Sequence, residues 1–309
     1  MTVAFTFPGQ GSQAIGMGRA LAERFASARA VFEEVDAALG QRLSQIMWEG
    51  PEADLTLTEN AQPALMAVSM AVVRVLEAER GMTVANTAAY VAGHSLGEYS
   101  ALAAAGTFSL ADAAQLLKIR GQAMQMATPV GTGAMAALLG LDFAEAAAVA
   151  AEASQGDVCQ AANDNTAGQV VISGHKAAVE RALDIAKAHG AKRAIMLSVS
   201  APFHCALMQP AADAMAEALA TVSMKAPLVP LIANVVAGPI SDPVVIRQKL
   251  VEQVTGTVRW RECVGFMAAQ GVTQFYELGA GKVLTGLLKK NAPEAQGFAI
   301  GTPEEIANV

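Results

Sequence analysis

Hydrophobic residues recur with two periods along this chain, one typical of strands and one typical of helices. Short apolar runs at residues 3–7 and 88–92 each lead through a glycine-containing turn into a stretch with helical spacing. Alternation of strands and helices is typical of a layered α/β fold. In this first part we expect helices through about residue 39, over about 62–80, and over about 109–126.

The middle of the chain has a different order of elements, β-α-β-β-α-β. We expect its strands at 134–139, 158–162, 169–173 and 193–199, and its helices at 142–154 and 177–189. This order is the ferredoxin-like pattern, and its length of about seventy residues suits a small domain. We therefore expect residues 128–198 to be an insert in a larger α/β domain formed by 1–127 and 199–309.

Beyond the insert, strands and helices alternate again. We expect helices at 206–220, 244–254 and 282–290, and strands at 228–236 and 273–278. This part of the chain completes the larger domain.

The segment Gly93-His94-Ser95-Leu96-Gly97 lies between an expected strand and an expected helix. A Gly-x-Ser-x-Gly turn in that position is typical of a nucleophile elbow, which exposes the serine hydroxyl at the end of a sheet. The backbone N–H of Leu96 would lie at a helix N-terminus, where it can bind a developing oxyanion. The pattern predicts that Ser95 becomes acylated.

The same serine also matches a purely structural motif. Ser95 and Glu98 fit the Ser-x-x-Glu capping box, which only starts a helix. Ser109 begins a similar box without neighbouring glycines. Because a capping box requires neither Gly93 nor Gly97, the two glycines favour the elbow.

A glycine-rich loop at residues 9–14 follows the first strand. It matches G-x-G-x-x-G/A, the dinucleotide-binding fingerprint, which needs a second strand ending in an acidic residue about twenty positions later. Glu33, Glu34 and Asp36 occupy that region inside a helical pattern, so the required strand is missing. The other use of such a loop is to present the backbone N–H of Gln10 as a second oxyanion donor.

His204 is the best candidate for the general base among the four histidines. It lies between a strand and a helix, where catalytic loops often occur. His94 adjoins the serine, so the turn should direct it elsewhere, and His175 and His189 are expected at the surface. A core histidine bonded to backbone is the structural alternative for His204.

Arg120 occupies a position on the apolar stripe of the expected 109–126 helix. A charge on a buried stripe needs a partner. One candidate is an internal salt bridge, for example to Glu98. The other is a substrate carboxylate held by the guanidinium fork.

Composition limits the function further. The formal net charge of −7 argues against nucleic-acid binding, which normally requires a basic surface. Cys159, Cys205 and Cys263 have neither disulfide nor zinc spacing, which favours a reducing cytoplasm, and no signal-peptide pattern begins the chain. The uncharged stretch 121–141 contains glycines and a proline, so we expect no membrane span there.

Four separated motifs resemble the malonyl-CoA:acyl-carrier-protein transacylase family of fatty acid synthesis. They are residues 8–13 (PGQGSQ), 93–99 (GHSLGEY), 168–174 (GQVVISG) and 203–208 (FHCALM), and the resemblance runs from about residue 7 to 290. It implies an α/β-hydrolase-like large domain with a ferredoxin-like insert. It also implies malonyl-CoA and acyl carrier protein as substrates, with no cofactor and no metal.

The resemblance also implies roles for individual residues. Ser95 and His204 match the nucleophile and base, and Arg120 matches the arginine that binds the malonyl carboxylate. Gln253 matches the glutamine whose backbone carbonyl orients the histidine. Gln13 and Asn165 match polar residues that line the site, and Phe203 is expected to disfavour an added α-methyl group by its bulk.

Acyl carrier proteins of such pathways are acidic, so docking on this acidic chain requires local basic clusters. The candidates are Lys192, Arg193, Lys282, Lys289 and Lys290, each of which can also be ordinary surface charge. Two other classes of function share the elbow. A hydrolase would need neither Arg120 nor a docking surface, and a binding protein would need no intact Ser95 and His204.

Overall fold

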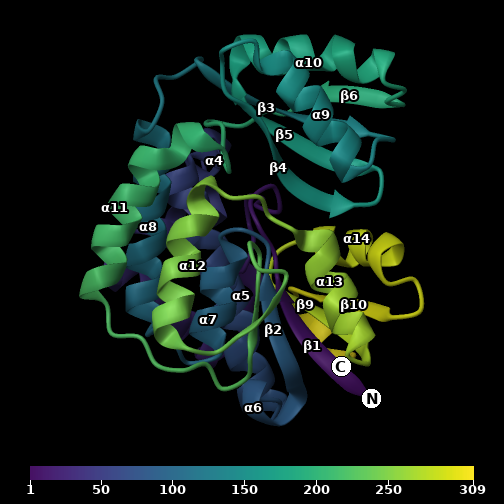
Figure 1. Cartoon of the computed structure of the whole chain (residues 1–309). Coiled ribbons are helices and arrows are strands. Elements are labelled where there is room, and N and C mark those ends of the chain that lie inside the picture. Colours follow the sequence, from purple (N-terminus) through teal and green to yellow (C-terminus); the bar gives the residue numbers. More distant parts are fainter.

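Alternate side chains of β1 (Thr2–Phe7) enter two different hydrophobic cores. Phe5 and Phe7 pack into the core on one side of the sheet, whereas Ala4 packs into the core on the other side. A strand covered on both faces is typical of a parallel sheet between helical layers. The computed structural model describes residues 1–309 and has this mixed α/β architecture (Figure 1).

The larger sheet contains six strands in the order β10-β9-β1-β2-β7-β8. Its strands pair in parallel, except that β7 and β8 are antiparallel. Besides β1, they are β2 (Ala88–Gly93), β7 (Leu231–Ala233), β8 (Gly238–Ile240), β9 (Val272–Leu278) and β10 (Gln296–Ile300). The central strand β2 ends at Gly93, the first residue of the expected elbow.

The smaller sheet contains four antiparallel strands in the order β4-β5-β3-β6. They are β3 (Gly133–Leu139), β4 (Cys159–Thr166), β5 (Gln169–His175) and β6 (Arg193–Met196), with helices α9 (Phe143–Ser154) and α10 (Lys176–Ala188) between them. These elements occur in the expected β-α-β-β-α-β order. They have a hydrophobic core of their own. The strands and helices of this part lie above the larger sheet in Figure 1.

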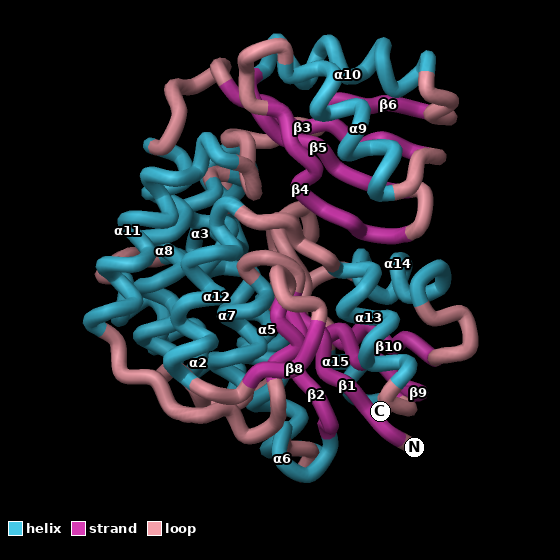
Figure 2. Tube along the Cα trace, viewed as in Figure 1, coloured by secondary structure: helices cyan, strands magenta, loops and turns pink.

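Helices cover both faces of the larger sheet (Figure 2). The N-terminal helices are α1 (Arg19–Arg24), α2 (Ala26–Leu39), α3 (Leu43–Glu49), α4 (Glu52–Thr56), α5 (Thr58–Arg80) and α6 (Val84–Thr87). After them come α7 (Gly97–Ala104), α8 (Leu110–Met126), α11 (Gln209–Thr221), α12 (Pro243–Thr255), α13 (Trp260–Ala269), α14 (Val283–Asn291) and α15 (Pro303–Ala307). A 3₁₀ turn at Ala206–Met208 precedes α11.

Helix α5 is the only one long and apolar enough to cross a membrane, and 83% of its most apolar window is buried inside the fold. It packs between α2 and α8 within the main core. Burial of this apolar stretch by other helices is typical of a core helix.

The smaller sheet is fastened to the larger domain along β4. The backbone of Asp164 donates to the carbonyl of Val258, whose own N–H donates to Ala162. The buried carboxylate of Asp164 also pairs with Arg261 at 2.8 Å. This seam holds β4 next to the segment that follows α12.

Several expected boundaries were wrong. The 228–236 strand is only Leu231–Ala233, because Leu228 bonds instead to the loop at Ala105 and the chain turns after Ala233. The strand expected to reach residue 199 ends at Met196, where the chain leaves the sheet. The first helix breaks at Phe25, whose extended backbone separates α1 from α2.

Candidate active site

Ser95 lies on a sharp turn between β2 and α7, and its φ of 53° is in the left-handed region. A Cβ atom on Gly93 would overlap the backbone of Gly97, and one on Gly97 would overlap the carbonyl of Phe7. Both flanking positions therefore require glycine. Strain of this kind at a serine is typical of a nucleophile elbow.

The capping-box alternative for this serine was wrong. The Ser95 side chain makes no cap, because its hydroxyl bonds to side chains from other parts of the chain. The Ser109 side chain, in contrast, accepts from the backbone N–H of Asp112 at 3.0 Å and does cap α8. Two similar sequences thus have different roles because only one has flanking glycines.

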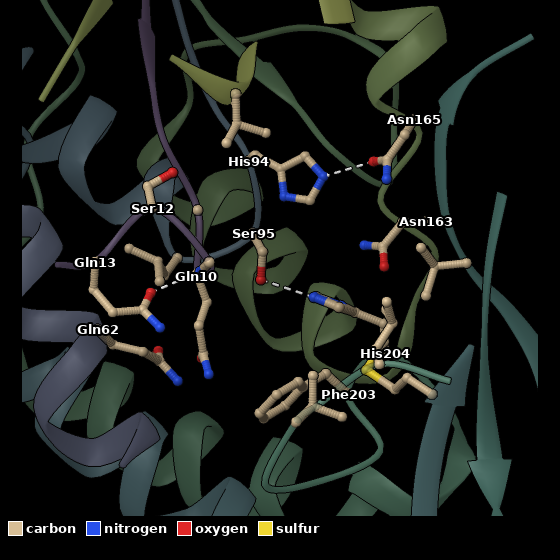
Figure 3. Close-up of a pocket in the computed structure, with 18 of the residues that line it drawn as sticks. Gln10, Ser12, Gln13, Gln62, His94, Ser95, Asn163, Asn165, Phe203 and His204 are labelled. Atoms are coloured by element: carbon tan, nitrogen blue, oxygen red, sulfur yellow. Dashed lines mark hydrogen bonds between the residues drawn. The ribbon is translucent and has the colours of Figure 1, made fainter. Parts of the chain in front are cut away.

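The hydroxyl of Ser95 lies 2.7 Å from Nε2 of His204 (Figure 3). On the other side of the ring, Nδ1 of His204 lies 2.9 Å from the backbone carbonyl of Gln253. A carbonyl can only accept, so Nδ1 carries the proton and donates. In a neutral ring this leaves the lone pair of Nε2 facing the Ser95 hydroxyl.

His204 is buried, and its environment keeps the ring neutral. Burial and the nearby positive charge of Arg120 lower the pKa of His204 to about 3. A neutral imidazole at physiological pH can take a proton directly, which is what a general base needs.

Arg120 projects from α8 into the same site and is 1% exposed. Its Nη1 donates to Oε1 of Gln62 at 2.7 Å, and its Nη2 donates to Oε1 of Gln253 at 2.8 Å and to Ser95 Oγ at 3.1 Å. The guanidinium also lies 5.7 Å from the ring centre of Tyr99. All of its hydrogen-bond partners are neutral, and no carboxylate lies within 4.0 Å of it. The salt bridge to Glu98 that the sequence left open is therefore absent.

Glu98 instead belongs to a buried hydrogen-bond network beneath the elbow. Its Oε1 accepts from the backbone N–H of Asn234 at 2.7 Å, and its Oε2 accepts from Nε2 of Gln253. The side-chain oxygen of Asn234 accepts from the backbone N–H of Ser95 at 2.8 Å. Burial raises the pKa of Glu98, and the two donors and Arg120 oppose that rise.

A cavity of about 370 Å³ opens at Ser95 between the two sheets. Gln10, Gln13, Asn165 and Phe203, all expected at the site, line it (Figure 3). Leu96 lines it as well, and neither its backbone N–H nor that of Gln10 donates to another group in the protein. Two free N–H groups beside the serine are suited to an oxyanion.

His94 also lines the cavity, and its Nε2 lies 2.9 Å from the side-chain oxygen of Asn165. As expected, the turn directs it away from the Ser95 hydroxyl. Gln62 and Asn234 were not expected at the site. Neither belongs to a local motif, so only the tertiary structure places them there.

The dinucleotide alternative for the loop at 9–14 was wrong. Glu33, Glu34 and Asp36 lie on α2, and β1 pairs with β2 and β9, so no second strand follows as that fingerprint requires.

No group of three or more His, Cys, Asp or Glu side chains is placed to hold a metal ion.

The five cations expected to dock a carrier protein are exposed and form no salt bridge. Lys282 immediately precedes α14, whose residues Val283, Leu284 and Leu287 line the cavity. Lys289 and Lys290 lie in the last turn of α14. Lys192 and Arg193 lie at the start of β6, whereas the cavity is lined by residues 197–200 beyond its other end.

Comparison with known proteins places this geometry in a family. The sequence model of the acyl transferase domain matches residues 4–301. The malonyl CoA-acyl carrier protein transacylase of Escherichia coli K12 is 47% identical over 304 residues, which cover 98% of this chain and 97% of that protein. The chain belongs to the malonyl-CoA:acyl-carrier-protein transacylase family.

Solved structures of transacylases agree with this assignment. The acyl-carrier-protein-S-malonyltransferase of Bartonella henselae is 58% identical, with a TM-score of 0.97 over 100% of this chain and 98% of that one. A malonyl-transacylase in complex with a type II PKS acyl-carrier protein is 43% identical, with a TM-score of 0.96 over 100% and 98%. The likeness thus extends over the whole transacylase fold.

Proposed function

We propose that this chain transfers a malonyl group from malonyl-CoA to an acyl carrier protein in fatty acid biosynthesis, through an acyl-enzyme on Ser95. The observation that carries the proposal is the position of the Ser95 hydroxyl. It lies within hydrogen-bond distance of both a neutral base, His204, and a buried cation that has no carboxylate partner, Arg120. An acyl group with its own carboxylate fits this arrangement, because its carbonyl can react with Ser95 while its carboxylate contacts Arg120.

In the first half-reaction, Nε2 of His204 takes the proton of Ser95 as Oγ bonds to the thioester carbonyl carbon. The N–H groups of Gln10 and Leu96 hold the oxyanion, and one such donor is typically worth about 3 kcal/mol. The C–S bond then breaks, and the proton passes from His204 to the sulfur of coenzyme A. Malonyl-Ser95 remains.

In the second half-reaction, the phosphopantetheine thiol of the carrier protein attacks the same carbonyl. His204 takes the thiol proton and returns it to Oγ as the Ser95 ester bond breaks. The two half-reactions share one site and give ping-pong kinetics. No step requires a cofactor or a metal ion.

Arg120 would bind the malonyl carboxylate through its guanidinium fork. Gln253 would hold the tautomer of His204 through its backbone carbonyl, and Gln13, Asn165 and Phe203 would shape the cavity. The unpaired cations Lys282, Lys289 and Lys290 beside the cavity support carrier docking on α14, and Lys192 and Arg193 are more distant candidates.

The domain division expected from the sequence is part of the proposal. Residues 1–127 and 199–309 form an α/β-hydrolase-like domain, supported by the parallel order of β9, β1, β2 and β7 and by the elbow after β2. Residues 128–198 form a ferredoxin-like domain, supported by the antiparallel order β4-β5-β3-β6. Three buried, unpaired cysteines support a cytoplasmic location.

The test is to incubate the protein with malonyl-CoA and to measure its intact mass. A stable gain of one malonyl group, lost on adding carrier protein, is expected of the transferase. Rapid release of free malonate without a carrier would indicate a hydrolase instead. No adduct and no turnover would indicate a binding protein.

A further inference from the structure

Glu98 is a buried carboxyl that does not touch the substrate cavity, and the mechanism above gives it no role. It is 1% exposed and lies in the first turn of α7, three positions after the nucleophile. Its two oxygens accept N–H donors, one from Asn234 and one from Gln253, which is the arrangement of a carboxylate.

The side-chain amide of Gln253 connects this carboxyl to the cation of the site. Its Nε2 donates to Glu98 and also to the backbone carbonyl of Ser95 at 2.9 Å. Its Oε1 accepts from Nη2 of Arg120 at 2.8 Å. An amide has one donor end and one acceptor end, so the bond to Glu98 fixes which end faces Arg120.

We propose that Glu98 is a positioning residue for malonyl selectivity, acting on Arg120 through the amide of Gln253. This inference rests on the proposed function, in which Arg120 binds the malonyl carboxylate. Glu98 turns the acceptor end of Gln253 toward the guanidinium. It also keeps its own carboxyl behind Gln253 and not against Arg120.

The separation of the Glu98 carboxyl from Arg120 matters because a carboxylate paired directly with Arg120 would compete with the substrate. A buried guanidinium requires compensation for its lost hydration. Two neutral amides, Gln62 and Gln253, supply hydrogen bonds without neutralising its charge. The cation therefore stays buried and ordered, and an incoming carboxylate meets no competing one.

The first test is Glu98→Gln, which presents an NH₂ group to Gln253 and forces that amide to turn its own NH₂ toward Arg120. We expect the ratio of kcat/KM for malonyl-CoA to that for acetyl-CoA to fall by about tenfold to a hundredfold, the effect of losing a hydrogen bond to a charged group. Glu145→Gln is the matched control, because Glu145 occupies the first turn of α9 far from the cavity and caps only that helix.

The second test exchanges the two side chains in Glu98→Gln/Gln253→Glu. The new amide at position 98 can still accept from Asn234 and donate to the carboxylate at 253, and the backbone carbonyl at 253 still faces His204. The carbonyl of Ser95 loses its side-chain donor, and the negative charge now touches Arg120. We expect a folded protein, somewhat less stable than the wild type because of the lost donor to Ser95, with a malonyl-to-acetyl ratio lowered at least about tenfold, mainly through the KM for malonyl-CoA. A ratio restored by the exchange would mean that a carboxylate against Arg120 does not compete with the substrate, which contradicts the inference.

The outcomes separate this inference from the proposed function. An unchanged ratio in folded Glu98→Gln, or a restored ratio in the exchanged variant, would overturn the role of Glu98 while malonyl transfer by the wild type still stands. If Glu98→Gln does not fold, the exchanged variant decides alone, and its failure to fold would also contradict the inference. A wild type that is not acylated by malonyl-CoA would overturn the proposed function itself.

Discussion

The Nη2 atom of Arg120 lies 3.1 Å from the Oγ atom of Ser95. A buried cation and a nucleophile in contact can act on two groups of one small molecule only if those groups are close together. In a malonyl thioester a single methylene separates the carboxylate from the reacting carbonyl. The contact between Arg120 and Ser95 is thus matched to a short dicarboxylic acyl group.

Removal of this cation should reduce the preference for malonyl. Breaking a buried charge pair costs about 3–5 kcal/mol, so Arg120→Ala should lower the malonyl-to-acetyl ratio of kcat/KM by at least about a hundredfold. Arg19→Ala, which removes a solvent-exposed arginine, is the control. An unchanged ratio in folded Arg120→Ala would reject carboxylate binding by this residue.

The bulk of Phe203 should exclude a branched acyl group. Its side chain is buried beside His204 and lines the cavity. Phe203→Ala should raise the rate with methylmalonyl-CoA relative to malonyl-CoA by about tenfold, the scale of one methyl group in a pocket. The same substitution at Phe298, an exposed aromatic on β10, should leave the ratio unchanged. Equal ratios in both variants would remove Phe203 from the specificity of the site.

Acylation should persist at acidic pH. Burial and Arg120 lower the pKa of His204 to about 3, below its ordinary value of 6.5. An ordinary histidine would be only about 3% neutral at pH 5, whereas His204 stays neutral there. Single-turnover acylation should therefore change less than about twofold between pH 7 and pH 5. A fall in the acylation rate with an apparent pKa near 6.5 would contradict the lowered pKa of His204.

The same pKa has a consequence for stability. The pKa of His204 is depressed in the folded state, so protonation favours the unfolded chain. Its contribution to the free energy of unfolding is present above pH 6.5 and is lost as the pH falls toward 3. Replacing His204 with Gln should reduce the change in the free energy of unfolding between pH 6.5 and pH 3, as measured by denaturant titrations at several pH values. If stability depended on pH as steeply in this variant as in the wild type, the lowered pKa of His204 would be contradicted.

Carrier-protein binding should depend on α14. Lys289→Glu/Lys290→Glu should raise the KM for carrier protein several-fold at low salt, where such contacts are least screened, and leave acylation by malonyl-CoA unchanged. Reversal of Lys187, which lies on α10 and pairs with Asp184, is the control. The same KM for both variants would place docking elsewhere.

The sequence predicted those parts of the site that local geometry fixes. Gly93, Ser95 and Gly97 specify the elbow by their spacing, which can be read in the sequence. The structure shows the reason for the spacing, because the backbone beside Gly93 and Gly97 leaves no room for a side chain. The order of strands and helices along the insert followed in the same way from periodicity. Arg120 could be recognised as anomalous on an apolar stripe, although its partners could not be named.

The remaining parts depend on contacts between distant segments. Gln62, Asn234 and the side chain of Gln253 come from three elements, and no local pattern indicates that they meet beneath Ser95. The short β7 likewise results from competition, because Leu228 bonds to the loop at Ala105 instead of extending the strand. Hydrophobicity alone predicted a longer strand there.

Malonyl transfer by the proposed mechanism requires an ester on Ser95. The most direct measurement is to digest malonyl-CoA-treated protein and to locate the added malonyl group by mass spectrometry, in the wild type and in Ser95→Ala. We expect one malonyl group on the peptide that contains Ser95, and none in the variant, which should fold normally because alanine fits the turn. A malonyl group on another residue, or equal labelling of folded Ser95→Ala, would contradict this mechanism.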